Sequence, residues 1–180
     1  MKKLILVLMS IFVLIGCTTS NSPTKRTEEF LTRYQSLSDE VLSDLDLSAE
    51  TENLGSTNTK TYKDVITRQY QNLKYEITDE NVNGDEAVVT AKVTVYDLYK
   101  TMKDSESYRT TNPTEFQENG MNSQNKFLEY ELDQMLKTND TIDYTIDFYL
   151  EKVDDTWQMK ELSNTTKEKI HGTYNYDLEQ

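Results

Sequence analysis

The sequence is poor in residues that carry chemistry. Its 180 residues include one cysteine, Cys17, one histidine, His171, and one tryptophan, Trp157. A chain with a single cysteine cannot form an internal disulfide, so its folded part has to be stabilised by an apolar core. The sequence also holds no complete catalytic or cofactor motif, and we predict that it binds no cofactor.

The chain also lacks an apolar run long enough to cross a bilayer. Its apolar stretch, residues 4–15, spans about a dozen residues, whereas a membrane helix needs roughly 20. Lys2 and Lys3 precede this stretch and small residues follow it. A basic start, a short apolar core and a small-residue junction are typical of an export signal.

The end of this signal carries a family resemblance. It reads Leu14-Ile15-Gly16-Cys17, which resembles the lipobox of bacterial lipoproteins. In that family a diacylglyceryl group is attached to the cysteine sulfur, and cleavage then makes the cysteine the first residue. The resemblance implies that residues 1–16 are a signal peptide and that Cys17 carries a palmitate-type lipid anchor. Two acyl chains are enough for stable attachment to a membrane. The expected location is the extracytoplasmic face of the cell membrane.

Positive charge is scarce. The chain has 19 Lys and Arg against 32 Asp and Glu, a net charge of −13, and removal of Lys2 and Lys3 with the signal makes it −15. Such an acidic surface repels phosphate backbones, which excludes nucleic acid as a partner. It also repels anionic lipid head groups, except at Lys25 and Arg26 beside the anchor. Alanine occurs at only three positions while Asn, Thr, Lys and Tyr are plentiful, which favours a Gram-positive source.

The spacing of apolar residues divides the chain after the signal into predicted segments. We expect a lipidated cysteine and flexible tether at 17–26, one domain at 27–174 and a frayed acidic tail at 175–180. An apolar stripe at residues 30–45 predicts a single helix of about 20 residues beginning near Ser22-Pro23. We expect a loop at 48–58, and then a helix from about Lys60 to Asn72 that starts with an approximate capping box at 61–64.

The period then changes from helical to alternating. Residues 73–95 predict a hairpin with its turn at Asn83-Gly84. Helices are predicted from Leu98 to Arg109 and from about Ser123. A second hairpin, residues 142–159, turns at Asp154-Asp155, and a short helix at 164–170 ends at Gly172. The predicted fold class is α+β: a curved antiparallel sheet of about four strands packed on N-terminal and inserted helices.

This element order is similar to the nuclear-transport-factor-2-like, or cystatin-like, fold, in which a curved sheet wraps a long helix as a cone. The resemblance spans about residues 27–174. Three segments carry it: residues 96–100 (YDLYK), 157–162 (WQMKEL) and 169–174 (KIHGTY). Exported lipoproteins of Gram-positive bacteria with such domains include many of unknown role. Enzymes of this superfamily place an Asp or His base in the mouth of the cone.

Asp97 is the candidate base that this resemblance suggests, with Tyr75 or Tyr144 as possible neighbours. The alternative is that Asp97 caps the helix that begins at Leu98. His171 is the other candidate, although a histidine at that place also fits a helix C-terminus. The sequence therefore leaves open a lyase or isomerase that uses an acid in the cone mouth.

Two other patterns could carry function. Asp79, Asn81 and Asn83 match the first half of a calcium loop, but Thr90 stands where such a loop has its bidentate Glu. We therefore predict no metal site. Tyr96, Tyr99 and Tyr149 fall on outward phases and could form a binding patch or pack against the inserted helices.

The interpretation that we favour is a non-catalytic binding or interaction module of the cell envelope. Its partners would be the membrane, through Cys17, and an envelope protein or a small ligand. Trp157 is expected to be buried under the helices, against the inward face of residues 142–148.

Overall fold

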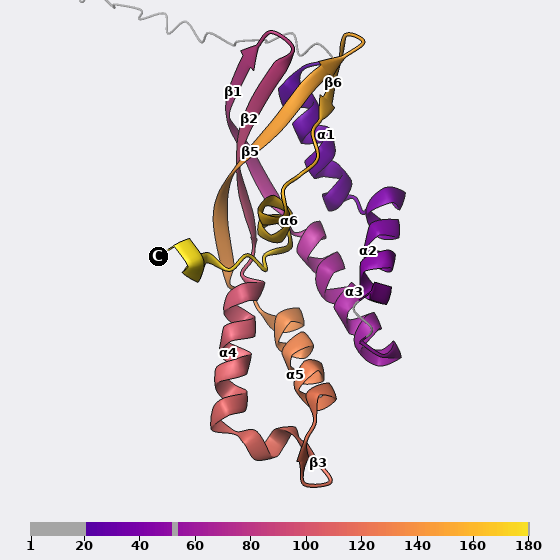
Figure 1. The fold of residues 1–180 in the computed structure, drawn as a ribbon, viewed down its shortest axis with the longest axis vertical. Coiled ribbons are helices and arrows are strands. Elements are labelled where there is room, and N and C mark those ends of the chain that lie inside the picture. Colours follow the sequence, from indigo (N-terminus) through magenta and orange to yellow (C-terminus); the bar gives the residue numbers. More distant parts are fainter. Residues whose placement is uncertain (1–20, 52–53, 180) are drawn as a thin grey trace, which may run out of the picture.

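The computed structural model describes residues 21–51 and 54–179. The signal at 1–16, the lipobox Leu14–Cys17 and residues 17–20 of the predicted tether lie outside the described residues. In chain order (Figure 1) the elements are α1 Pro23–Gln35, α2 Asp39–Thr51, α3 Ser56–Gln71, β1 Lys74–Asn83, β2 Glu86–Tyr96, α4 Leu98–Thr111, η1 Pro113–Phe116, β3 Gln117–Glu118, β4 Met121–Asn122, α5 Gln124–Lys137, β5 Thr141–Val153, β6 Thr156–Met159, α6 Asn164–His171 and η2 Tyr176–Glu179.

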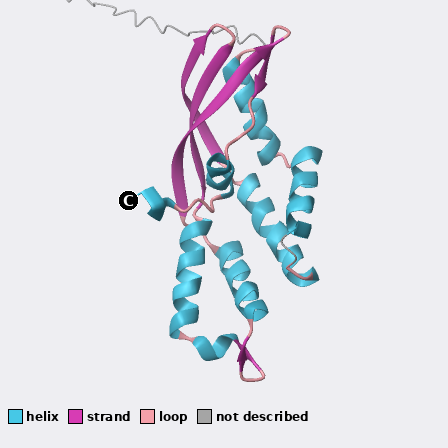
Figure 2. Cartoon of the chain, in the orientation of Figure 1, coloured by secondary structure: helices cyan, strands magenta, loops and turns pink. Residues whose placement is uncertain are grey.

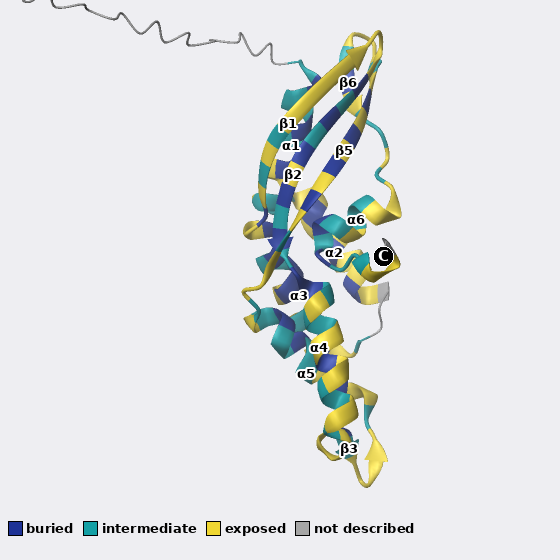
Figure 3. Cartoon of the chain, turned by 90° about the vertical axis from the view of Figure 1, so that its left-hand side faces the viewer, coloured by how far each residue is buried: buried dark blue, intermediate teal, exposed yellow. Residues whose placement is uncertain are grey.

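The main sheet has four antiparallel strands in the order β1-β2-β5-β6, and it does not close. The two central strands, β2 and β5, alternate between buried and more exposed residues, as Figure 3 shows. The buried phase packs against α1, α3 and α6, whereas the opposite face is polar. On that face Thr90 and Thr94 donate hydrogen bonds to Asp147 and Asp143. The α+β prediction is therefore confirmed. The inward residues of the two central strands are Ala87, Val89, Ala91, Val93, Val95, Tyr144, Ile146, Phe148 and Leu150.

Both predicted hairpins form, with tight turns at one end of the sheet (Figure 2). The first turn lies one residue later than expected, because Asn83 pairs with Glu86 and leaves Gly84-Asp85 as the loop. Gly84 takes a φ of +64°, which a residue without Cβ adopts at little cost. The second turn is at Asp154-Asp155, where both residues have positive φ, as mirror-image hairpin turns require.

The prediction of a single N-terminal helix is wrong. Its apolar stripe is divided between α1 and α2, because the chain turns at residues 36–38. Leu37 adopts a left-handed φ of +52°, and Ser38 donates its amide hydrogen to the carbonyl oxygen of Arg33. This bonding pattern terminates helices, although glycine more often occupies the left-handed position. The Ser38 hydroxyl then accepts from the amide of Val41 in the first turn of α2.

The predicted loop at 48–58 is too long. Helix α2 continues to Thr51, and α3 begins at Ser56 rather than at Lys60. Thr61 consequently lies inside α3, where its hydroxyl donates to the carbonyl of Thr57 four residues earlier, so it does not cap a helix. Serine, threonine and asparagine favour loops by propensity, but packing of α2 against α3 overrides that preference here.

Helices α4 and α5 form an arm that extends beyond the sheet (Figure 1). Asp97 and Ser123 cap the two helices, each accepting an amide hydrogen from the first turn. Aromatic rings hold the arm together: Tyr108 stacks on Tyr130 with 5.1 Å between ring centroids, and Phe116 packs edge-on against both Tyr130 and Phe127. The short hairpin of β3 and β4 closes the end of the arm.

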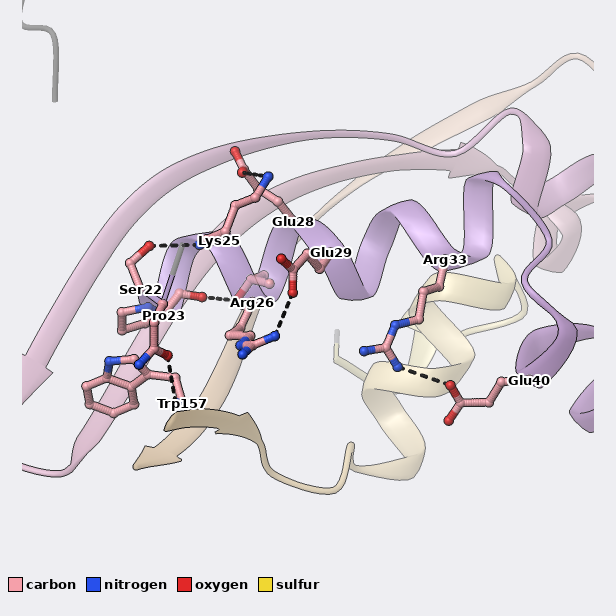
Figure 4. A network of polar contacts seen from close by, with 11 residues as sticks. Ser22, Pro23, Lys25, Arg26, Glu28, Glu29, Arg33, Glu40 and Trp157 are labelled. Carbon is pink, nitrogen blue, oxygen red and sulfur yellow. Dashed lines mark hydrogen bonds and ion pairs between the residues drawn. The ribbon is translucent and has the colours of Figure 1, made fainter. Parts of the chain in front are cut away.

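Trp157 is buried, as predicted, but not against residues 142–148. It pairs with Lys152, so it lies at the turn end of β5, away from Ile142 and Tyr144. Figure 4 shows its ring beside Ser22 and Pro23 at the start of α1. Its backbone amide donates to the Asn21 side chain over 3.1 Å. The prediction placed the residue on the correct face of the sheet but at the wrong end.

The two ends of the described chain are more ordered than the predicted tether and tail. Helix α1 begins at Pro23 with Ser22 as its cap, as the Ser22-Pro23 pair predicted, so residues 23–26, which were also assigned to the tether, form its first turn. The tail, expected to fray, folds into η2 and is held at α4. Tyr99 donates a hydrogen bond to Asp177, and Lys103 forms an ion pair with the same carboxylate. The sequence pattern showed an acidic tail but gave no sign of these partners.

Candidate functional site

His171 occupies a central position among the helices. It is the last residue of α6, and Gly172 ends the helix in the left-handed conformation that the sequence predicted. The imidazole Nε2 forms a 2.9 Å hydrogen bond with the hydroxyl of Tyr70 on α3. The Tyr70 ring in turn packs edge-on against Tyr34 on α1, with 4.8 Å between centroids. Three helices therefore contribute to one aromatic cluster.

Two cavities flank this histidine. The α2–α3–α6 cavity has a volume of about 260 Å³, and the α3–α4–α5 cavity about 340 Å³. Tyr62, Ile66 and His171 line both, so α3 and the imidazole separate them. The first cavity also contains Tyr34, Asp44, Tyr70 and Lys167, whereas the second is lined largely by apolar side chains.

The floor of the α2–α3–α6 cavity, which we define as the rings of Tyr34, Tyr70 and His171, is kept uncharged by burial. Burial, together with nearby Lys167, lowers the pKa of His171, which is therefore neutral at pH 7. Burial also raises the pKa of Tyr34 and Tyr70, and in both cases the Asp44 carboxylate adds to the rise. Asp44 thus acts electrostatically on both rings. No hydrogen bond or ion pair to Asp44 is found within residues 21–51 and 54–179.

The α3–α4–α5 cavity contains one carboxyl group, Glu131. Burial raises its pKa, and Glu106 adds to the rise while Arg109 opposes it. The surrounding side chains include Leu98, Met102 and Met135. This cavity can accept an apolar group, but it offers few hydrogen-bonding partners with which to orient one.

Asp97, the candidate base, caps helix α4, which was the alternative interpretation of this residue. Its carboxylate accepts the amide hydrogen of Lys100 over 2.9 Å and the hydroxyl hydrogen of Tyr176 over 3.2 Å. Of the two expected neighbours, Tyr75 lies beside Thr32, and the phenol that donates to Asp97 is that of Tyr176 in the tail. Asp97 is buried and lines neither cavity beside His171.

The other sequence candidates are spread over the molecule. Asp79, Asn81 and Asn83 lie along the extended strand β1, where residues 79 and 83 are roughly 13 Å apart, too far to surround one ion. Among the residues that the structure describes, no three His, Cys, Asp or Glu side chains are grouped as metal ligands.

The three outward tyrosines form no common patch. Arg68 lies over the ring of Tyr96, Tyr99 packs against Tyr176, and Tyr149 is exposed on the outer face of the sheet. The surface-patch hypothesis is therefore wrong for this set.

Sequence reasoning missed the cluster of Tyr34, Tyr70 and His171. Tyr34 lies within the predicted apolar stripe of residues 30–45, and Tyr70 lies within the helix predicted from Lys60 to Asn72. Tyr70 and His171 are 101 residues apart, and no motif linked them. Asp44 lies on the helix that was predicted as a continuation of α1, and only the turn at residues 36–38 brings it beside the tyrosines.

Comparisons with known proteins give little further information. No family model matches the chain, and no curated protein matches it. A structural comparison finds similarity to ycdA from Bacillus subtilis subsp. subtilis str. 168, a protein assigned only provisionally as a lipoprotein, with 18% identity and a TM-score of 0.40. The match covers 83% of this chain and 47% of that one, so the chain spans about half of its length. Similarity of this degree carries no inference about function.

The resemblance to the nuclear-transport-factor-2-like fold stays a prediction. No helix within residues 21–51 and 54–179 is both long and apolar enough to cross a bilayer.

Proposed function

We propose that this protein is a lipid-anchored, extracytoplasmic binding protein that holds a small organic cation in the α2–α3–α6 cavity. The anchor is Cys17, and its support is the signal at residues 1–16 with the lipobox Leu14–Cys17. The observation that carries the binding proposal is the convergence of three tyrosines and an unpaired carboxylate on one cavity with a neutral floor.

Aromatic faces attract cations through their quadrupoles, and cages of perpendicular rings bind quaternary ammonium groups. Tyr34 and Tyr70 are at 82° to each other, and Tyr62 lines the same cavity. Asp44 adds a negative charge on the α2 side. Of the two basic residues of the cavity, His171 is neutral, whereas Lys167 keeps its charge and opposes a bound cation, a repulsion that its ion pair with Glu161 at 3.5 Å offsets only in part.

The size of the cavity limits the ligand. About 260 Å³ admits a trimethylammonium-type group with a short substituent, and is smaller than the 300–1,000 Å³ of most drug-sized sites. We do not extend the proposal to catalysis, because Asp97 is bound by Lys100 and Tyr176 as a helix cap.

The binding test is calorimetric titration of the purified full chain in detergent with choline and with 3,3-dimethylbutan-1-ol, its uncharged isostere. We expect heat of binding with choline and none with the isostere. Asp44→Asn should weaken choline binding by about fivefold, the effect of losing roughly 1 kcal/mol of exposed charge attraction. Asp39→Asn, on the same helix but outside the cavity, is the matched control. Equal responses to the two ligands, or none to either, would reject a cation site.

The anchor has a separate test. Cys17→Ser removes the sulfur that accepts the lipid, and we expect the variant to leave the membrane fraction or to remain unprocessed. A variant that still partitions fully with membranes would contradict anchoring through Cys17.

A further inference from the structure

The first described residue of the chain is fastened to the turn end of the sheet. The Asn21 side-chain amide donates to the carbonyl of Asp155 over 2.5 Å, and its oxygen accepts the amide hydrogen of Trp157 over 3.1 Å. Asp155 is in the β5–β6 turn, and Trp157 is the second residue of β6. Asn21 is thereby held from both sides by one hairpin.

Helix α1 begins beside the same hairpin. The Ser22 hydroxyl caps its first turn by accepting the amide hydrogen of Lys25, and Pro23 has the fixed φ that suits a first helical residue. The amide of Thr24 donates to the Glu80 carboxylate of β1 over 2.8 Å. Figure 4 shows this start of α1 against Trp157. The entry point of the chain is therefore a fixed part of the domain.

Only four peptide units separate Cys17 from Asn21. Whatever their conformation, they span at most about 14 Å. If Cys17 carries the lipid, the turn end of the sheet cannot move farther than this from the bilayer surface. Because residues 23–26 belong to α1, the tether is shorter than the expected 17–26, and the domain cannot lie as far from the membrane as that tether would allow.

The arm lies at the other end of the molecule (Figure 1). Strand β2 has 11 residues and α4, which continues from it, has 14, so together they extend roughly 50 Å from the turn end. The tip of the arm carries Met121, whose side chain is 71% exposed. A lipid on Cys17 would hold one end of this long axis at the membrane and leave the other end free.

The turn end exposes apolar side chains next to acidic turns. Val82 and Val153, close to the two turns, are 48% and 40% exposed. Exposed Asp85, Asp154 and Asp155 form the turns themselves. Acidic turns oppose insertion into the hydrocarbon, so the contact is limited to the polar surface of the bilayer.

We infer that the domain stands upright on the membrane, with the Gly84-Asp85 and Asp154-Asp155 turns facing the head groups and the α4–α5 arm directed away from them. This inference rests on the proposed lipid anchor at Cys17. Its partner surface is the bilayer itself, and it makes the tip of the arm the most distant point that the protein presents outside the membrane.

The test uses the fact that Cys17 is the only cysteine, whose lipidated sulfur cannot react with a maleimide. Asp85→Cys at the turn end and Met121→Cys at the tip each give one labelling site in the full lipidated chain. Each labelled protein is placed in vesicles that contain a head-group acceptor dye, and energy transfer is measured. We expect several-fold higher transfer from position 85 than from position 121. Asn83→Cys is a second donor at the turn end, in case Asp85→Cys folds poorly.

A variant with about 20 Gly and Ser residues inserted after Ser20 is the control. Such a linker spans roughly 25 Å on average, so transfer from position 85 should fall toward that from position 121. Equal transfer from the two positions in the unmodified tether would overturn the upright orientation while leaving the anchor intact. Failure of the labelled proteins to float with the vesicles would overturn the anchor, and the orientation with it.

Discussion

Single residues fix how the helical layer meets the sheet. Gln69 on α3 is fully buried, and its amide forms two hydrogen bonds with the backbone of Tyr96 at the end of β2. The Tyr96 amide donates to the Gln69 oxygen over 3.0 Å, and the Gln69 nitrogen donates back over 3.2 Å. Gly172 lies against this pair. A Cβ at position 172 would be 2.2 Å from the Tyr96 carbonyl oxygen and 2.3 Å from the Gln69 amide nitrogen.

Gly172→Ala should therefore be strongly destabilising. Its φ of +74° costs an alanine about 1–2 kcal/mol, and displacement of Gln69 adds about 1–3 kcal/mol for buried polar groups left without partners. Gly84→Ala is the matched control, because Gly84 has a φ of +64° and no atom within 4 Å of the added Cβ. Urea unfolding of the two variants measures the difference. Equal losses of stability would show that the contact with Gln69 and Tyr96 has no energetic weight.

His171 gives stability a pH dependence whose sign follows from its lowered pKa. The folded pKa is below that of the unfolded chain, about 6.5, so the unfolded state takes up a proton first as the pH falls. The contribution of His171 to the free energy of unfolding is fully present above about pH 6.5 and decreases as the pH drops toward the folded pKa. The other ionisable groups that line its cavities are Tyr34, Asp44, Tyr62, Tyr70, Glu131 and Lys167.

His171→Gln removes this titration and can still donate a hydrogen bond to Tyr70. We expect the free energy of unfolding of the variant to fall less than that of the natural chain between pH 7.5 and 5. Comparison of the two proteins cancels the carboxylates that titrate in the same interval. Parallel curves would mean that His171 is not titrated on unfolding.

At the scale of elements, the arm has its own small core. Phe116 is 5% exposed and contacts Tyr108, Phe127 and Tyr130, whereas the sheet core consists of other residues. Local packing of this kind allows a part of a protein to open separately from the rest.

Phe116→Ala should loosen the arm more than the sheet. A buried Phe→Ala change costs about 3–5 kcal/mol, and here the lost contacts are confined to α4, η1 and α5. Hydrogen exchange should accelerate at amides of α4 and α5 and change little in β2 and β5. Met121→Ala, at an exposed position of the same arm, should leave all four unchanged. Uniform acceleration across arm and sheet would show that they unfold as one unit.

Elements with a strong local signal could be predicted from the sequence. The alternation of residues 87–95 and 142–150 acts within a few residues, as do the turn signals at Asn83-Gly84 and Asp154-Asp155. Both hairpins formed, the first with its turn one residue later, and Asp97 caps α4 as its alternative interpretation predicted. The break between α1 and α2 at residues 36–38 could not be predicted, because Leu37, and not a glycine, adopts the left-handed conformation there.

The site was less predictable than the elements. The hydrogen bond between Tyr70 and His171 and the packing of Tyr176 on Asp97 depend on how distant helices meet, so local patterns carry no trace of them.

For the whole molecule, charge repulsion competes with charge pairing. The ion pairs found in the described residues join side chains that are at least 31% exposed, and pairs of this kind contribute about 0–1 kcal/mol each. Against them stands a net charge of −13, or −15 without the signal's lysines, whose mutual repulsion acts over longer distances and opposes compaction.

Salt distinguishes the two effects, because screening removes long-range repulsion more completely than contacts between neighbouring charges. The Debye length is about 30 Å at 0.01 M salt and about 10 Å at 0.1 M, whereas the ion pairs are joined at 3.7 Å or less. We therefore expect sodium chloride to raise the melting temperature between about 0.01 and 0.3 M. Asp79→Asn combined with Asp154→Asn removes two exposed, unpaired charges and should reduce that rise. A melting temperature that falls with salt would mean that the ion pairs outweigh the repulsion, and that the acidic surface carries no stability cost.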